Sequence, residues 1–140
     1  GVTLSSAVML AWIRTLQLMT GVYEEILVGV TVSGRDGRLE GIDTVVGLLI
    51  ETIPFVGPLL YDKSDRRQLH DMALQLSDSQ EHLCASLNDI QHWTDRKSLF
   101  QSVCVHENYP GTDTDALFAS VLVHERTHFP LAMLPSLMPR

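Results

Sequence analysis

The sequence predicts a single domain or lobe of the α/β (α+β) class, with helices packed against a mixed sheet. Two observations lead to this prediction. An apolar helical segment and an amphipathic helical segment alternate with runs of β-branched residues, in the order α-β-β-α-β-β. The 140 residues suffice to bury a hydrophobic core without disulfides, and 45% of them are hydrophobic, which excludes intrinsic disorder.

The first half of the chain is predicted to form one helix and two strands. Residues 3–19 have helical periodicity with apolar residues around most of the cylinder, so we expect this helix to be buried on more than one side. Thr3 or Ser5 can cap its start, and Gly21 can end it. Residues 24–32 are a β-branched strand. After a turn-rich loop at 33–41, residues 45–55 form a strand that stops around Pro54.

The second half is predicted to form two helices and further strands. Ser64 is the expected N-cap of an amphipathic helix that runs to about residue 85, and Ser86 opens a short helix through Trp93. Strands are expected at 99–106 and 131–134. Residues 111–115 are a turn, and residues 117–123 fit either a strand or a helix.

The charge pattern argues against several classes of partner. Ten Lys and Arg face seventeen acids, for a net charge of -7, so we expect no nucleic-acid surface, and no basic run is available for an anionic membrane. The apolar N-terminal segment lacks a basic n-region and is interrupted by Arg14, so it is neither a signal peptide nor a membrane span. Charged residues make up only 19%, which suggests that another surface covers part of this one.

The cysteines and one short motif are candidates for chemistry. Cys84 and Cys104 form no CxxC and are expected to be free thiols. If residues 99–106 are a strand, Cys104 and His106 share a face near Asn108, but a buried thiol beside a satisfied histidine is the favoured interpretation.

Residues 124–128 read His-Glu-Arg-Thr-His and fit the HExxH zinc motif. Pro130 would end such a helix just past His128, and no third ligand follows, so we favour a loop or strand end and expect no metal. A zinc hydrolase using His124 and His128 stays an alternative.

Six short segments, in order, resemble a known family. They read Ser33-Gly34-Arg35 after a strand, Gly-Ile-Asp at 41–43, Val-Gly-Leu-Leu-Ile-Glu-Thr-Ile-Pro at 46–54, Leu-Asn-Asp-Ile-Gln at 87–91, Leu-Phe at 99–100 through Glu-Asn-Tyr-Pro at 107–110, and Thr-His-Phe-Pro-Leu at 127–131. No piece is specific alone, but the ordered set resembles the C-terminal lobe of a nonribosomal peptide synthetase condensation domain, in the chloramphenicol acetyltransferase-like superfamily.

The resemblance implies that residues 1–140 are a partial C-terminal lobe and that the N-terminal catalytic lobe is absent. The family's His-His-x-x-x-Asp-Gly motif belongs to that other lobe, and no two histidines are adjacent here. Position 1 is not Met, which fits a piece of a longer protein. The implied activity is amide formation between a carrier-bound thioester donor and an amine acceptor, in natural product or antibiotic biosynthesis. This chain would contribute no catalytic residue and would be inactive alone.

The resemblance also implies partners and site residues. The partners are the N-terminal lobe and carrier protein domains in the cytoplasm, with substrates on 4'-phosphopantetheine arms and no cofactor bound directly. The tunnel wall would include Ser33, Gly34, Arg35, Glu51, Thr52 and Asn108. The family has Asn at the position of Glu51. We therefore expect the Glu51 side chain to be solvent-exposed and to influence the acceptor substrate, or else to pair with Arg35.

Two further hypotheses stay open beside the zinc hydrolase. A coenzyme A- or carrier-dependent acyltransferase has the same architecture, and only its partner lobe and acceptor would separate it from a condensation domain. A non-catalytic interaction module that kept the fold is the other, because an unpaired carboxylate at Glu51 is costly to bury in a tunnel.

Overall fold

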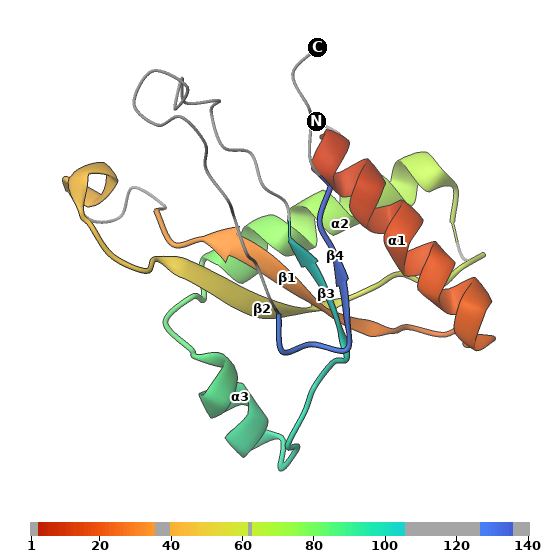
Figure 1. Ribbon diagram of the computed structural model, residues 1–140. Helices are drawn as coiled ribbons and strands as arrows, with labels where there is room; N and C mark the ends of the chain where they lie inside the picture. The colour runs from red at the N-terminus through yellow and green to blue at the C-terminus, as the bar shows by residue number, and fades with distance from the viewer. Residues whose placement is uncertain (1–2, 36–39, 62, 106–126, 136–140) are drawn as a thin grey trace, which may run out of the picture.

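A computed structural model shows four strands in one mixed sheet and describes residues 3–35, 40–61, 63–105 and 127–135, apart from the side chain of Asp43. The sheet order is β2-β1-β3-β4 (Figure 1). β1 pairs antiparallel with β2, whereas the β1–β3 and β3–β4 pairs are parallel. The predicted α/β (α+β) class with helices on a mixed sheet is confirmed. The strands are β1 (Leu27–Ser33), β2 (Ile50–Val56), β3 (Ser102–Val105) and β4 (Leu131–Met133).

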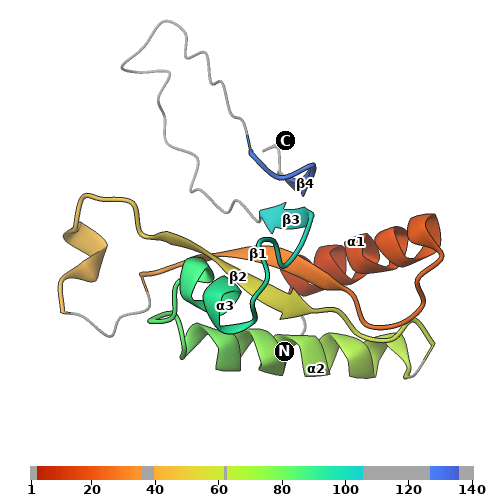
Figure 2. The same ribbon diagram turned by 90° about the horizontal axis from the view of Figure 1, so that it is seen from below.

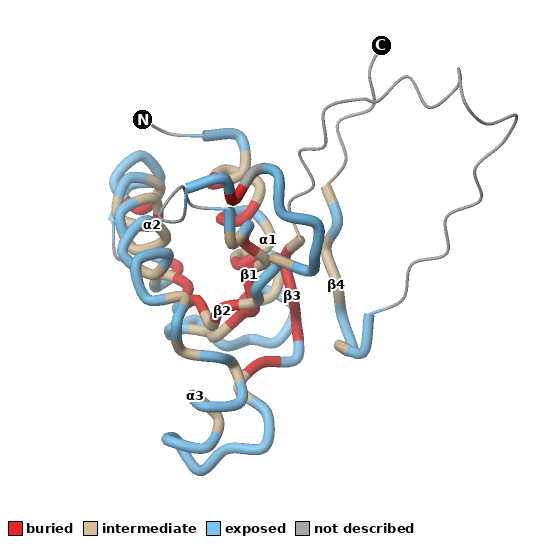
Figure 3. Tube along the Cα trace, turned by 90° about the vertical axis from the view of Figure 1, so that its left-hand side faces the viewer, coloured by how far each residue is buried: buried red, intermediate tan, exposed pale blue. Residues whose placement is uncertain are grey.

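Helices α1 (Leu4–Thr20) and α2 (Asp65–Gln80) build the core together with one face of the sheet. Val28, Val30 and Val32 of β1 alternate toward this face, as expected for a period of two. Figure 3 shows the buried residues gathered where α1 and α2 meet β1 and β2. The core comprises Met9, Leu10, Ile13, Val28, Val30, Val32, Ile53, Phe55, Met72 and Cys104.

The ends of α1 follow the sequence prediction, but its burial does not. Ser6 donates its N–H to Thr3 Oγ1 at 3.2 Å, and Gly21 ends the helix in the left-handed region at φ 70°. The expectation of burial on more than one side is wrong, because Leu18 and Met19 are exposed. The buried residues Ser6, Met9, Leu10, Ile13 and Gln17 recur at helical spacing along a single face.

The strand boundaries differ from the predictions at both ends of the β1–β2 hairpin. β1 begins at Leu27 instead of residue 24, and β2 begins at Ile50 instead of residue 45. β2 also continues through Pro54 to Val56, where the prediction ended it. Pro54 is tolerated because β2 is an edge strand, so its missing N–H costs no ladder hydrogen bond. β3 and β4 are shorter than the predicted strands, within the described residues.

The amphipathic helix is shorter than predicted, and the short helix is as predicted. α2 starts after Ser64 but ends at Gln80 rather than near residue 85. α3 (Leu87–Trp93) starts at a capping box, in which Ser86 Oγ accepts from the Asp89 N–H and the Asp89 carboxylate accepts from the Ser86 N–H. Figure 2 shows α3 apart from α1, and none of its residues is buried.

A polar contact joins α1 to the start of α2. Arg14 donates to Asp65 Oδ1 at 2.6 Å and to Gln68 Oε1 at 3.2 Å. The hydrogen bond from Arg14 lowers the pKa of the Asp65 carboxyl. Because Asp65 is exposed, this pair orients the two helices more than it stabilises them.

Candidate functional site

The Ser-Gly-Arg turn closes the β1–β2 hairpin through a backbone contact that only glycine permits. Gly34 donates its N–H to the Leu49 carbonyl at 2.6 Å. A Cβ added at Gly34 would lie 2.5 Å from that same oxygen, which is backbone and cannot rotate away. Gly34 therefore allows the backbone after β1 and the backbone before β2 to approach more closely than a side chain would permit.

Arg35 holds part of the connection between β1 and β2. Its guanidinium donates to the carbonyl of Ile42 at 2.6 Å and to the carbonyl of Val45 at 3.0 Å. They belong to the first residue of η1 (Ile42–Thr44) and to its C-cap, Val45. This 3-10 helix was not predicted from the sequence. One arginine thus fixes both ends of this short turn, in the fork geometry that lysine lacks.

The residues after η1 form an apolar tip on the hairpin, defined here as residues 45–50. Val46 is 100% exposed and Leu48 is 88% exposed, although both are aliphatic. Figure 2 shows the η1 end of the hairpin projecting beyond the rest of the sheet. Exposed apolar side chains that lie together in this way make residues 45–50 a candidate interaction surface. The apolar run at 45–55 predicts a strand across these residues, and Gly47 is the sequence signal against that prediction.

Glu51 and Thr52 lie on opposite faces of β2. Glu51 is the register partner of Val32 on the helix-covered face, whereas Thr52 faces Thr31 on the other. Glu51 is exposed, and the structure shows no ion pair between it and Arg35, whose guanidinium binds the two carbonyls instead. The carboxylate is therefore in water in this chain, and its place in a tunnel stays a prediction.

Several other predicted residues lie outside the described ranges. These are Asn108, His106, and three residues of the HExxH segment, His124, Glu125 and Arg126, as well as the segments at 111–115 and 117–123. Within the described ranges, no group of three or more His, Cys, Asp or Glu residues is placed to hold a metal ion. The described helices also include none long and apolar enough to cross a membrane.

The two thiols are free and lie in different environments. Cys84 is exposed, whereas Cys104 on β3 is buried among the core residues. Burial raises the pKa of the Cys104 thiol to about 11, because the low-dielectric interior disfavours the thiolate. Cys104 is therefore not an activated nucleophile, and the hypothetical dyad with His106 gains no support from it.

We expect native alkylation to modify Cys84 alone. Iodoacetamide at neutral pH should add one carbamidomethyl group, located on Cys84 by peptide mass spectrometry, because the thiolate is the reactive form. Unfolding in urea should expose the second thiol and give two modifications. Modification of Cys104 in the native chain at a rate similar to that of Cys84 would contradict this assignment.

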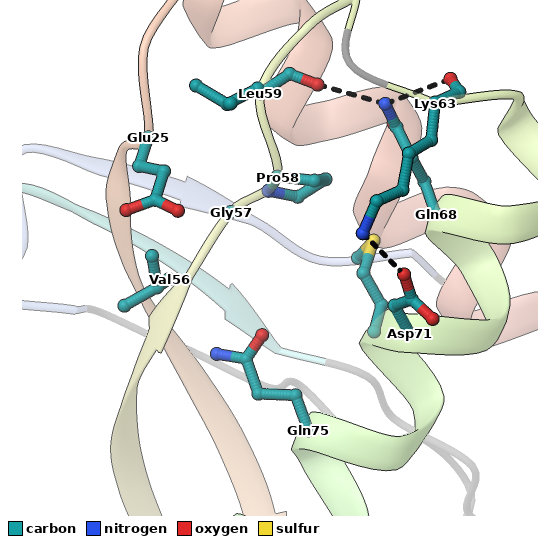
Figure 4. A pocket seen from close by; sticks show the side chains of 10 residues that line it. Glu25, Val56, Gly57, Pro58, Leu59, Lys63, Gln68, Asp71 and Gln75 are labelled. Carbon is teal, nitrogen blue, oxygen red and sulfur yellow. Dashed lines mark hydrogen bonds and ion pairs between the residues drawn. The ribbon is translucent and has the colours of Figure 1, made fainter.

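A pocket of about 170 Å³ lies at the other end of the hairpin, between α2 and the segment after β2. Figure 4 shows Lys63 reaching Asp71 and Gln68 reaching backbone carbonyls on one side of the pocket, with Glu25 on the other side. Lys63 Nζ pairs with Asp71 Oδ2 at 2.9 Å, and Gln68 Nε2 donates to the Leu59 and Lys63 carbonyls. Lys63 and Asp71 pair with each other and Gln68 is bound to backbone carbonyls, so we interpret the pocket as structural and place the candidate site at the Ser-Gly-Arg end.

Comparison with known proteins identifies the family. The family model described as the condensation domain matches residues 1–129. The chain belongs to the condensation domain family. Chondramide synthase cmdD of Chondromyces crocatus is 40% identical over 114 residues, which are 78% of this chain and 3% of that protein. Vanchrobactin synthetase VabF of Vibrio anguillarum is 37% identical over 111 residues, which are 79% of this chain and 4% of that protein.

Solved structures show the same fold. The holo form of AB3403, a four-domain nonribosomal peptide synthetase, superposes with a TM-score of 0.70 at 19% identity, over 80% of this chain and 9% of that one. The first condensation domain of the CDA synthetase gives a TM-score of 0.64 at 16% identity, over 75% of this chain and 23% of that one. The predicted chloramphenicol acetyltransferase-like architecture is confirmed, and the chain spans only a small part of each relative.

Proposed function

We propose that this condensation chain is part of a C-terminal lobe that helps form amide bonds in nonribosomal peptide biosynthesis. The family match over residues 1–129 carries the proposal. The amine of an acceptor on one carrier protein attacks the thioester carbonyl of a donor on another. A C–N bond forms, the C–S bond breaks, and the donor's carrier thiol leaves with the proton lost by the amine.

The chain's own contribution to this reaction is a tunnel wall. The sequence lacks the adjacent histidines of the family's catalytic motif, so the base that receives the amine proton is proposed to come from the N-terminal lobe. The Ser-Gly-Arg turn and the start of β2 then position the substrate arms and exclude water. We include Ser33, Gly34, Arg35, Glu51 and Thr52 in this proposal, with Asn108 as the remaining candidate. Because Glu51 and Thr52 face opposite sides of β2, only one of these two side chains can point into the tunnel.

The exposed apolar tip supports a second lobe as partner. Val46 and Leu48 present uncovered aliphatic side chains, and Arg35 anchors the start of the tip by donating to the carbonyls of Ile42 and Val45. A preorganised apolar tip loses little entropy when another surface covers it. We propose that the N-terminal lobe covers it, while carrier proteins present their 4'-phosphopantetheine arms, and that this takes place in the cytoplasm.

Replacing Glu51 with asparagine tests the tunnel assignment. In the complete domain that contains this chain, Glu51→Asn should change the condensation rate or the acceptor preference and leave the free energy of unfolding within about 0.5 kcal/mol, as for an exposed residue. Product is followed by mass spectrometry with paired acceptors, and stability by urea denaturation.

Glu24→Gln is the matched control for this change. Glu24 is an exposed glutamate that precedes β1, at the opposite end of the strand from Ser33, and its replacement should alter neither readout. A large loss of stability with unchanged turnover in Glu51→Asn would instead make Glu51 a structural residue.

A further inference from the structure

A cavity of about 190 Å³ lies between the first turns of α1 and the end of α2, above the sheet. Its apolar lining comes from both helices and from the sheet. The lining side chains include Met9 of α1, Leu76 of α2, Val30 and Val32 of β1, and Cys104 of β3.

The cavity reaches the candidate site. Ser33, the first residue of the Ser-Gly-Arg turn, is among its lining residues, and so is Gln80 at the end of α2. Both residues are exposed, whereas Met9, Val30 and Cys104 are buried, so the cavity opens toward the turn and closes toward the core. A group that enters here comes from the side on which we place the tunnel wall.

The lining selects an uncharged occupant. It includes no Asp, Glu, Lys, Arg or His, so a charged group inside would have no partner for its charge. Cys104 is neutral at physiological pH, because burial raises the pKa of its thiol. The polar residues of the lining are all uncharged: Ser5, Ser6, Thr31, Ser33 and Gln80.

The volume sets the size of the occupant. A dry apolar cavity of about 150 Å³ accommodates a benzene ring, so the 190 Å³ here suits a branched aliphatic group or one small ring. A tryptophan side chain is too large for it without movement of the walls.

We propose that this cavity receives the uncharged aliphatic side chain of a carrier-bound aminoacyl thioester and so sets side-chain selectivity. This inference rests on the proposed function, and the side chain can come from the donor or from the acceptor. Leu76 is the residue to vary, because it lines the cavity from a helix and is only partly buried. Selectivity for such side chains amounts to about 10–200-fold per methylene in an apolar pocket.

The test uses the complete domain with leucyl, glycyl and phenylalanyl groups in competition, first as donors and then as acceptors. Leu76→Trp fills the cavity and should lower the leucyl-to-glycyl product ratio by about tenfold or more in one arm only, which identifies the source. Leu76→Ala enlarges the cavity and should raise the phenylalanyl-to-leucyl ratio in the same arm. Leu74→Trp and Leu74→Ala, at an exposed position on the same helix, should change neither ratio.

A second readout does not depend on turnover. In the chain itself, the methyl resonance of Met9 should shift on titration with the N-acetylcysteamine thioester of leucine, and not with that of aspartate. Unchanged ratios in both arms, with condensation intact in the variants, would overturn the inference and leave the proposed function standing. If the Met9 resonance shifts but the complete domain forms no amide, the inference stands and the proposed function is overturned. If the Met9 resonance does not shift, the inference is overturned.

Discussion

Phe55→Ala is expected to lower the free energy of unfolding by about 3–5 kcal/mol, the range for removing a buried aromatic side chain. Phe55 is 0% exposed and lies opposite Val28 in the β1–β2 pair. Both helices supply residues to the same cluster, so the cavity left by the ring cannot collapse without moving α1 or α2. Urea denaturation followed by circular dichroism measures the loss.

Val56→Ala is the control for this change. Val56 is the next residue on the same strand but points to the other face and is exposed, so its replacement should shift stability by about 0.5 kcal/mol or less. Equal losses for Phe55→Ala and Val56→Ala would mean that the sheet buries a different face from the one described.

Gly34→Ala is expected to reduce condensation by the complete domain about 100-fold, the scale of misplacing reacting groups by an ångström. The added methyl carbon would lie 2.5 Å from the Leu49 carbonyl oxygen, so the hairpin must open where the Ser-Gly-Arg turn meets β2. Opening it breaks the 2.6 Å hydrogen bond from Gly34 and moves the segment that Arg35 holds. The rate is measured with loaded carrier proteins under saturating conditions.

Gly47→Ala offers a matched comparison in the same hairpin. A Cβ at Gly47 meets nothing within 4 Å, and the residue does not have a positive φ. Its replacement should leave the hairpin closed. Any loss of condensation rate in Gly47→Ala therefore measures the effect of a glycine-to-alanine change without the clash at Leu49. If Gly34→Ala retained the wild-type rate, the geometry of this turn would not matter to the reaction.

The sequence predicted the elements better than it predicted their ends. The apolar residues 45–49 looked continuous with β2, but the last register pair is Ser33 with Ile50, and the next contact is the single bond from Gly34 to Leu49. A strand can extend only as far as its partner strand pairs with it. The residue at which β1 stops pairing is set by the tertiary structure and not by the local sequence. The same limit hid the parallel pairing of β1 with β3, which are far apart in the chain.

Buried glutamines are the other feature that hydrophobic patterning missed. Gln17 is 0% exposed, and its Nε2 donates to the carbonyls of Glu24 and Pro58, each at 2.9 Å. Gln68 of α2 does the same for the carbonyl of Leu59. These amides satisfy backbone groups in the segments flanking the hairpin, and periodicity assigns polar residues to the surface because it cannot show which carbonyls need a donor.

The candidate site was partly predictable for the same reasons. The Ser-Gly-Arg turn was found from its resemblance to the family, and the structure gives Gly34 and Arg35 definite roles in holding the hairpin. Glu51 and Thr52 were treated as neighbours in one wall, yet adjacent strand residues face opposite sides of the sheet. The exposed tip at Val46 and Leu48 depends on where the strand begins, which the sequence alone did not settle.

Amide formation from loaded carrier proteins tests the central claim most directly. Donor-loaded and acceptor-loaded carrier proteins are mixed with the complete domain, with this chain alone, or with buffer, and the product is quantified by mass spectrometry. The account predicts product with the complete domain and none above buffer with the chain alone, because its sequence lacks the adjacent histidines of the catalytic motif. Turnover by the isolated chain above the buffer rate, or no product from the complete domain, would contradict it.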